Sequence, residues 1–120
     1  MRNVVLKIIV CGFWACYTQI VMAKNLTQAT EHDYVTERYY LGIDSNKKIE
    51  SNMRIARANA DQIAQMKVVC VDMRQFYKAV IALNQANRHF NPNKIDADTK
   101  TYRALLKDIE QPNYCKQYGF

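Results

Sequence analysis

The fold of this chain depends on residues 49–90, which read IESNMRIARANADQIAQMKVVCVDMRQFYKAVIALNQANRHF and contain neither glycine nor proline. Because glycine and proline interrupt helices most strongly, their absence favours one long helix. In the second half of the stretch the apolar residues follow one another in steps of one, three or four, which places them on one broad helical face. They are Ile63, Met66, Val69, Cys70, Met73, Phe76, Tyr77, Val80 and Leu83. This face predicts a packed core.

Two places weaken the long helix. Asn59 followed by Gln62 imitates a capping box, which predicts a break near residues 58–60. The valine-rich residues 68–71 have low helix propensity. We expect a continuous helix, with a break near residues 58–60 as the alternative.

A shorter helix is predicted before the long one. Thr30 followed by Asp33 can cap its start, and Gly42 can supply the left-handed residue that ends it after Leu41. Residues 42–45 would then form a turn. Tyr34, Val35, Arg38 and Leu41 are expected on the buried side of this helix.

Another short helix is predicted near the C-terminus. Asn91 and Pro92 indicate a turn after the long helix, because proline disfavours helical geometry in the residue before it. Asp96 or Asp98 can then cap a helix that ends near Glu110.

Cys70 and Cys115 are predicted to form a disulfide. The chain from Cys70 to the turn advances about 30 Å as a helix, and the returning segment recovers roughly 35 Å, so an antiparallel hairpin brings the two sulfurs together. The sequence therefore predicts an all-α domain, a small bundle of three or four helices around one long central helix. Its C-terminal helical hairpin is closed by the disulfide.

Residues 1–23 are predicted to be a secretory signal peptide, followed by a single domain from 24 to 120. Arg2 and Lys7 make a basic start, residues 8–17 are mostly apolar, and cleavage is expected after Ala23. A retained membrane anchor and lipid attachment at Cys16 are the alternatives. The expected location is periplasmic or extracellular, where a disulfide persists. Membrane contact is expected only if the N-terminal segment is retained.

The sequence predicts no enzyme, with no catalytic residue, metal or cofactor. Beyond residue 23 the only serines are Ser45 and Ser51, and both lie where capping or surface roles are ordinary. His32 and His89 stand far apart without other metal ligands around them. Removing the predicted leader lowers the formal charge from +6 to +4, too small an excess to favour a nucleic-acid partner.

Exposed aromatic and basic residues suggest a surface for a protein partner. Lys67, Arg74 and Lys78 form a basic ridge on the long helix, suited to an acidic protein surface or anionic lipid. The other expected interaction residues are Tyr39, Tyr40, Tyr118 and Phe120. The predicted function is a non-enzymatic protein interaction or accessory module. The alternative is a carrier or sensor for a lipid or apolar small molecule held between the helices, and self-association stays open.

Overall fold

The computed structural model describes residues 26–120, so the predicted signal peptide lies outside the described part of the chain. Within residues 26–120 the regular structure is entirely helical. The elements are α2 (Glu31–Ala58), α3 (Gln62–Lys67), the π-helix η1 (Val68–Met73), α4 (Arg74–Ala86), the 3-10 helix η2 (Arg88–Phe90), α5 (Pro92–Ile109) and the 3-10 helix η3 (Lys116–Tyr118). No helix in this part of the chain is both long and apolar enough to cross a membrane.

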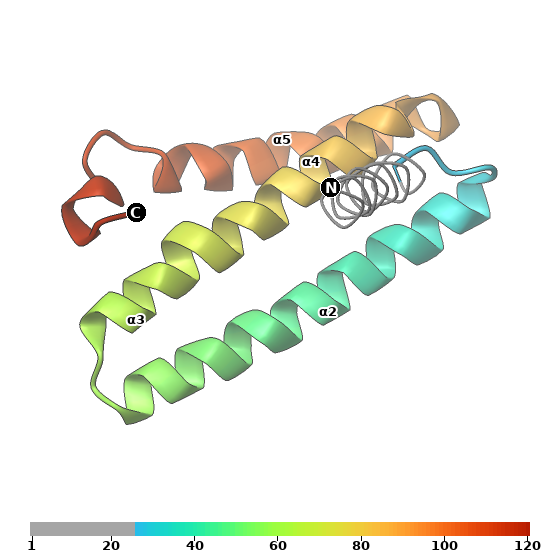
Figure 1. Cartoon of the computed structure of the whole chain (residues 1–120). Helices are drawn as coiled ribbons and strands as arrows, with labels where there is room; N and C mark the ends of the chain where they lie inside the picture. Colours follow the sequence, from blue (N-terminus) through green and yellow to red (C-terminus); the bar gives the residue numbers. More distant parts are fainter. Residues whose placement is uncertain (1–25) are drawn as a thin grey trace, which may run out of the picture.

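Residues 62–86 form a central rod in which α3, η1 and α4 follow one another without interruption. Figure 1 shows α2 beside this rod as the first arm of a hairpin and α5 alongside α4. Because each connection reverses the chain, α2 and α5 run in the same direction beside the rod. The predicted all-α bundle around a central helix is confirmed.

The central helix begins later than expected. α2 ends at Ala58, Ala60 has a left-handed backbone with φ of 48°, and the Asp61 carboxylate accepts a hydrogen bond from the Ala64 N–H at 2.9 Å. The prediction of one continuous helix over residues 49–90 is wrong, and the alternative of a break near residues 58–60 is correct. The left-handed residue turns the chain back, and the Asp61 cap starts the new helix.

The first helix runs through the predicted turn. Thr30 caps it as expected, because its hydroxyl accepts from the Asp33 N–H at 3.1 Å, but Gly42 lies inside α2 and does not end it. Leu41, directly before the glycine, packs against both hydrophobic clusters of the core. This packing outweighs the roughly 1 kcal/mol cost of a glycine within a helix.

The structure differs from the predicted helices at two further places, η1 and the start of α5. The valine-rich residues 68–71 lie in η1, so the weak point widens the helix instead of breaking it. α5 starts at Pro92, and Asn91 accepts from the Lys94 N–H at 3.4 Å, so Asp96 and Asp98 do not cap it. Proline suits the first helical position because the N–H it lacks would be unpaired there.

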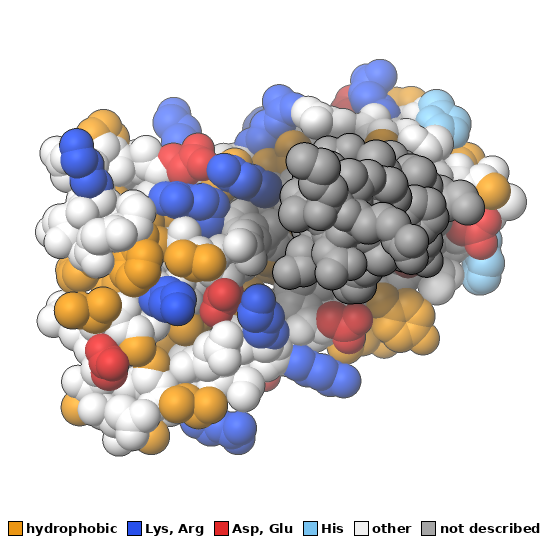
Figure 2. All heavy atoms as spheres, in the orientation of Figure 1, with side chains coloured by type: hydrophobic (Ala, Val, Ile, Leu, Met, Phe, Trp, Pro, Cys, Tyr) orange, Lys and Arg blue, Asp and Glu red, His pale blue; other side chains and the backbone are white. Residues whose placement is uncertain are grey.

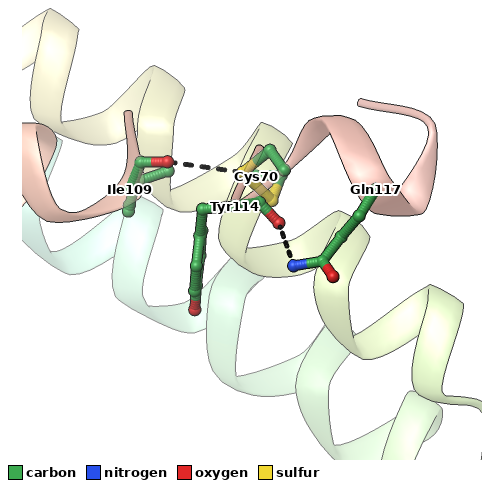
Figure 3. The surroundings of a disulfide bond; sticks show 5 residues. Cys70, Ile109, Tyr114 and Gln117 are labelled. Carbon is green, nitrogen blue, oxygen red and sulfur yellow. Dashed lines mark hydrogen bonds between the residues drawn. A yellow bond between two sulfur atoms is a disulfide. The ribbon is translucent and has the colours of Figure 1, made fainter. Parts of the chain in front are cut away.

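The disulfide joins Cys70 in η1 to Cys115 after α5, as predicted, with the Cα atoms 5.8 Å apart. Figure 3 shows its surroundings: the Cys115 sulfur lies 3.6 Å from the Ile109 carbonyl oxygen, and the Gln117 side chain donates to the Tyr114 carbonyl at 3.1 Å. Both cysteines belong to the main core, with Phe76, Tyr77, Val80 and Ile109. The disulfide therefore fixes the C-terminal segment against the rod.

Candidate functional site

A groove with a volume of about 520 Å³ lies between α2 and α5. Val35, Tyr39 and Ile43 line it from α2, Ile95 and Tyr102 line it from α5, and Phe76 reaches it from α4. Val35 is 54% exposed and Tyr39 is 61% exposed, so apolar side chains of the α2 wall are open to solvent. The expectation that Val35 would be buried is wrong, because α5 does not close over this side of α2.

Polar side chains from three helices form a connected network beside this groove. The Tyr34 hydroxyl donates to Asn84 Oδ1 at 2.8 Å, and Asn84 Nδ2 donates to Asp98 Oδ2 at 2.9 Å. Arg38 donates to the two oxygens of Asp98 at 2.9 and 3.2 Å. We call Tyr34, Arg38, Asn84 and Asp98 the floor network. It joins α2, α4 and α5 where α2 and α5 have little direct packing.

Burial and hydrogen bonding set the proton affinities of the floor network. Burial raises the pKa of Tyr34, and the nearby Asp98 carboxylate raises it further. Burial alone would raise the pKa of Asp98, but the hydrogen bonds from Arg38 and Asn84 outweigh it and hold that pKa below its usual value. Asp98 is therefore a stable carboxylate, and Tyr34 is a stable neutral donor.

An aromatic cluster supports the α5 wall of the groove. The Arg38 guanidinium carbon lies 5.0 Å from the centre of the Tyr102 ring, within the range of a cation–π contact. The same ring meets Phe76 and Tyr77 edge-on, with ring centres 5.5 and 5.6 Å away. These contacts hold Tyr102 from several sides, so the wall is preformed.

Asn87 attaches the segment before α2 to the end of α4. This fully buried side chain accepts from the Gln28 N–H at 2.7 Å and donates to the carbonyls of Leu26 and Leu83 at 2.6 and 2.8 Å. Tyr34 also stacks on Phe90, with ring centres 6.4 Å apart. The N-terminal end of α2 is thereby anchored next to the groove.

The predicted aromatic interaction residues lie in different surroundings. Tyr39 lines the groove, and Tyr40 is 54% exposed with its ring 5.5 Å from that of Tyr39. Phe120 packs partly buried against the main core, and Tyr118 is half-buried in η3. Of the four, the two α2 tyrosines are the more available to a partner.

The predicted basic ridge does not form one continuous strip. Lys67 lines a hollow of about 340 Å³ between α2 and the central rod. Lys78 lies 3.7 Å from the Glu110 carboxylate on the α5 side, and Arg74 is half-buried, its Nε without a hydrogen-bond partner among residues 26–120. η1 separates Lys67 from the other two, and its wider turn changes the helical register.

Sequence reasoning missed the floor network. Asn84 and Asn87 lie next to the apolar positions of the rod, and both are completely buried. Two amides at core positions were the available signal, because a buried amide needs hydrogen-bond partners. The partners of Asn84, in α2 and α5, could not be inferred from helical periodicity.

Within residues 26–120 no three metal-binding side chains come together. Compared with protein families, with curated proteins and with solved structures, the chain matches none.

Proposed function

We propose that this protein is an exported, non-enzymatic interaction module that binds an amphipathic helix of a protein partner in the groove between α2 and α5. The observation that carries the proposal is the apolar surface of this groove, with Val35 and Tyr39 exposed on α2 and Tyr102 held by aromatic contacts on α5. Exposed apolar surface beside a satisfied polar floor is typical of binding sites.

The dimensions of the groove suit a helix. Its α2 wall extends from Glu31 to Asn46, which corresponds to about 22 Å or four helical turns. A helix laid into such a groove offers apolar anchors at positions i, i+3 or i+4, and i+7. Both oxygens of Asp98 already accept hydrogen bonds, so the floor favours apolar side chains over polar ones.

The floor network supports binding rather than proton transfer. A general acid or base works best with a pKa near the working pH. Here the pKa of Tyr34 is raised and that of Asp98 is lowered, so each moves away from neutrality. The network is better suited to holding three helices in place.

Export is supported by the disulfide. Cys70 and Cys115 are 1% and 3% exposed and close a small helical domain, as is common where the surroundings are oxidising. Residues 1–23 supply the expected targeting signal, with a basic start and an apolar middle.

A carrier of an apolar small molecule is the second candidate. The groove volume of about 520 Å³ lies within the range of small-molecule sites. Native mass spectrometry after gentle purification tests it. A carrier retains a bound apolar molecule, whereas protein that is consistently empty argues against this function.

Affinity capture from the native envelope or medium tests the proposed function. The groove variant carries Val35→Glu and Tyr39→Glu, and the matched control carries Ile55→Glu and Ile63→Glu, at positions that are 55% and 62% exposed. We expect a stoichiometric protein partner with wild type and with the control, and its loss with the groove variant. Retention by the groove variant would contradict the proposal.

Charge reversal at Lys67, Arg74 and Lys78 provides a further arm of the capture experiment. If the partner is lost from this variant and kept by the groove variant, the interaction surface is the predicted basic ridge and not the groove.

A further inference from the structure

A second hollow, of about 460 Å³, lies between α4 and α5 on the side of α5 away from the groove. Gln85 and Arg88 line it from the α4 end, and Thr99, Lys100 and Arg103 line it from α5. Unlike the groove, this hollow is lined entirely by polar and charged residues. Figure 2 shows Lys and Arg side chains spread over the visible face of the molecule, including its upper part, where α5 lies.

The charges around the hollow do not balance. Arg88 donates two hydrogen bonds of 2.8 Å to the carboxylate of Asp96, so these two charges neutralise each other. Lys100 and Arg103 add two further positive charges one helical turn apart on the same face of α5, and Arg103 also interacts electrostatically with Asp96. Lys107 continues this row by another turn. The residues that line the hollow therefore carry a net charge of +2, from Arg88, Lys100 and Arg103 against Asp96.

The chemistry of the lining indicates the ligand. A guanidinium offers a planar fork of donors that matches phosphate oxygens, and a lysine ammonium adds a point charge. Gln85 and Thr99 bring an amide and a hydroxyl to the same hollow. We propose that the hollow between α4 and α5 binds a multiply charged anion bearing phosphate groups, held by Lys100 and Arg103. The hollow and the proposed helix-binding groove share no lining residue, but Asn84 of the floor network also lines the hollow.

Titration calorimetry of the full chain with inorganic pyrophosphate tests the site. The site variant is Lys100→Gln with Arg103→Gln, and the control is Arg54→Gln with Arg57→Gln, which removes the same charge from exposed positions of α2. We expect the affinity for pyrophosphate to fall about tenfold in the site variant, because two charge-assisted contacts are lost. The control should remain close to wild type. If the affinity for pyrophosphate falls equally in both variants, binding reflects general charge attraction and the proposal is overturned.

Sedimentation with vesicles distinguishes the source of the phosphate group. The probes are vesicles of phosphatidylcholine alone and of phosphatidylcholine mixed with phosphatidylglycerol. Binding to the mixed vesicles that the site variant loses and the control keeps supports the site with a lipid headgroup as ligand. If wild-type protein binds neither pyrophosphate nor the mixed vesicles, the proposal is overturned. We expect the Val35→Glu, Tyr39→Glu groove variant to bind pyrophosphate as tightly as wild type does. This result would separate the hollow from the groove.

Discussion

At the scale of single residues, the amide of Asn84 is the point where three helices are joined. Its oxygen accepts from Tyr34 and is fully buried, so removing the tyrosine hydroxyl leaves it unpaired. We predict that Tyr34→Phe lowers the free energy of unfolding by about 1–2 kcal/mol. Urea denaturation measures this, with Tyr40→Phe as the exposed control that leaves stability unchanged. Equal values for the two variants would contradict this account of the floor network.

The Asp98 carboxylate gives stability a dependence on acid pH. Its pKa is lower in the folded protein than in the unfolded chain, so its contribution is present above the unfolded pKa of about 4 and is lost as the pH falls through the folded pKa. We predict that Asp98→Asn costs about 1–2 kcal/mol at neutral pH, since the ion pair with Arg38 is partly exposed and screened. The loss should shrink as the pH falls below about 4. Urea denaturation at a series of pH values measures this. A difference in free energy of unfolding between variant and wild type that stays constant down to low pH would contradict the prediction.

At the scale of elements, Gly42 is a weak point within α2. A Cβ atom placed there would lie 3.5 Å from Arg38 Nη1, an ordinary van der Waals contact. We predict that Gly42→Ala raises the free energy of unfolding by about 0.5–1 kcal/mol, because alanine loses less backbone entropy in a helix. Gly119, with φ of 88°, is the opposite case, and Gly119→Ala should destabilise. Destabilisation by Gly42→Ala would mean that the added methyl group disturbs the Arg38 to Asp98 pair.

Local sequence signals predicted the helices better than their ends. Helical spacing identified the core face of the rod from Met66 to Leu83, and Thr30 capped α2 as expected. The prediction for Ile63 is wrong: it lies in the first turn of α3, next to the chain reversal, and is 62% exposed. Gly42 failed as a stop signal because Leu41 packs into both clusters, and tertiary packing overrides local propensity. The break at Ala60 was visible as an alternative, but the sequence did not decide whether long-range packing would favour the turn or the straight helix.

The groove depends on pairings that local sequence does not encode. Tyr34 and Asn84 are 50 positions apart, and Arg38 and Asp98 are 60 apart. Helical periodicity reports which residues share a face of one helix, but not which helix lies opposite. The disulfide was predictable because Cys70 and Cys115 are the two cysteines after residue 23, and the hairpin lengths bring them together.

At the scale of the whole molecule, the disulfide ties the C-terminal segment to the centre of the rod. Its cysteines are 45 positions apart, so in the chain-entropy account the bond contributes on the order of 4 kcal/mol. We predict that Cys70→Ala with Cys115→Ala lowers the free energy of unfolding by about 2–4 kcal/mol, the contribution typical of a disulfide. Guanidinium denaturation of the variant and of reduced wild type measures this. Unchanged stability in both would show that packing alone holds the segment.

A helix from a protein partner is proposed to bind in the groove between α2 and α5. Site-specific photo-crosslinking in the native host tests it directly, with the reactive group at Tyr39, which lines the groove, or at exposed Glu37 of the same helix, which does not. We predict one discrete protein adduct from position 39, with the crosslinked residues of the partner spaced as on a helix, and none from position 37. The same adduct from both positions, or no protein adduct from position 39, would contradict the claim.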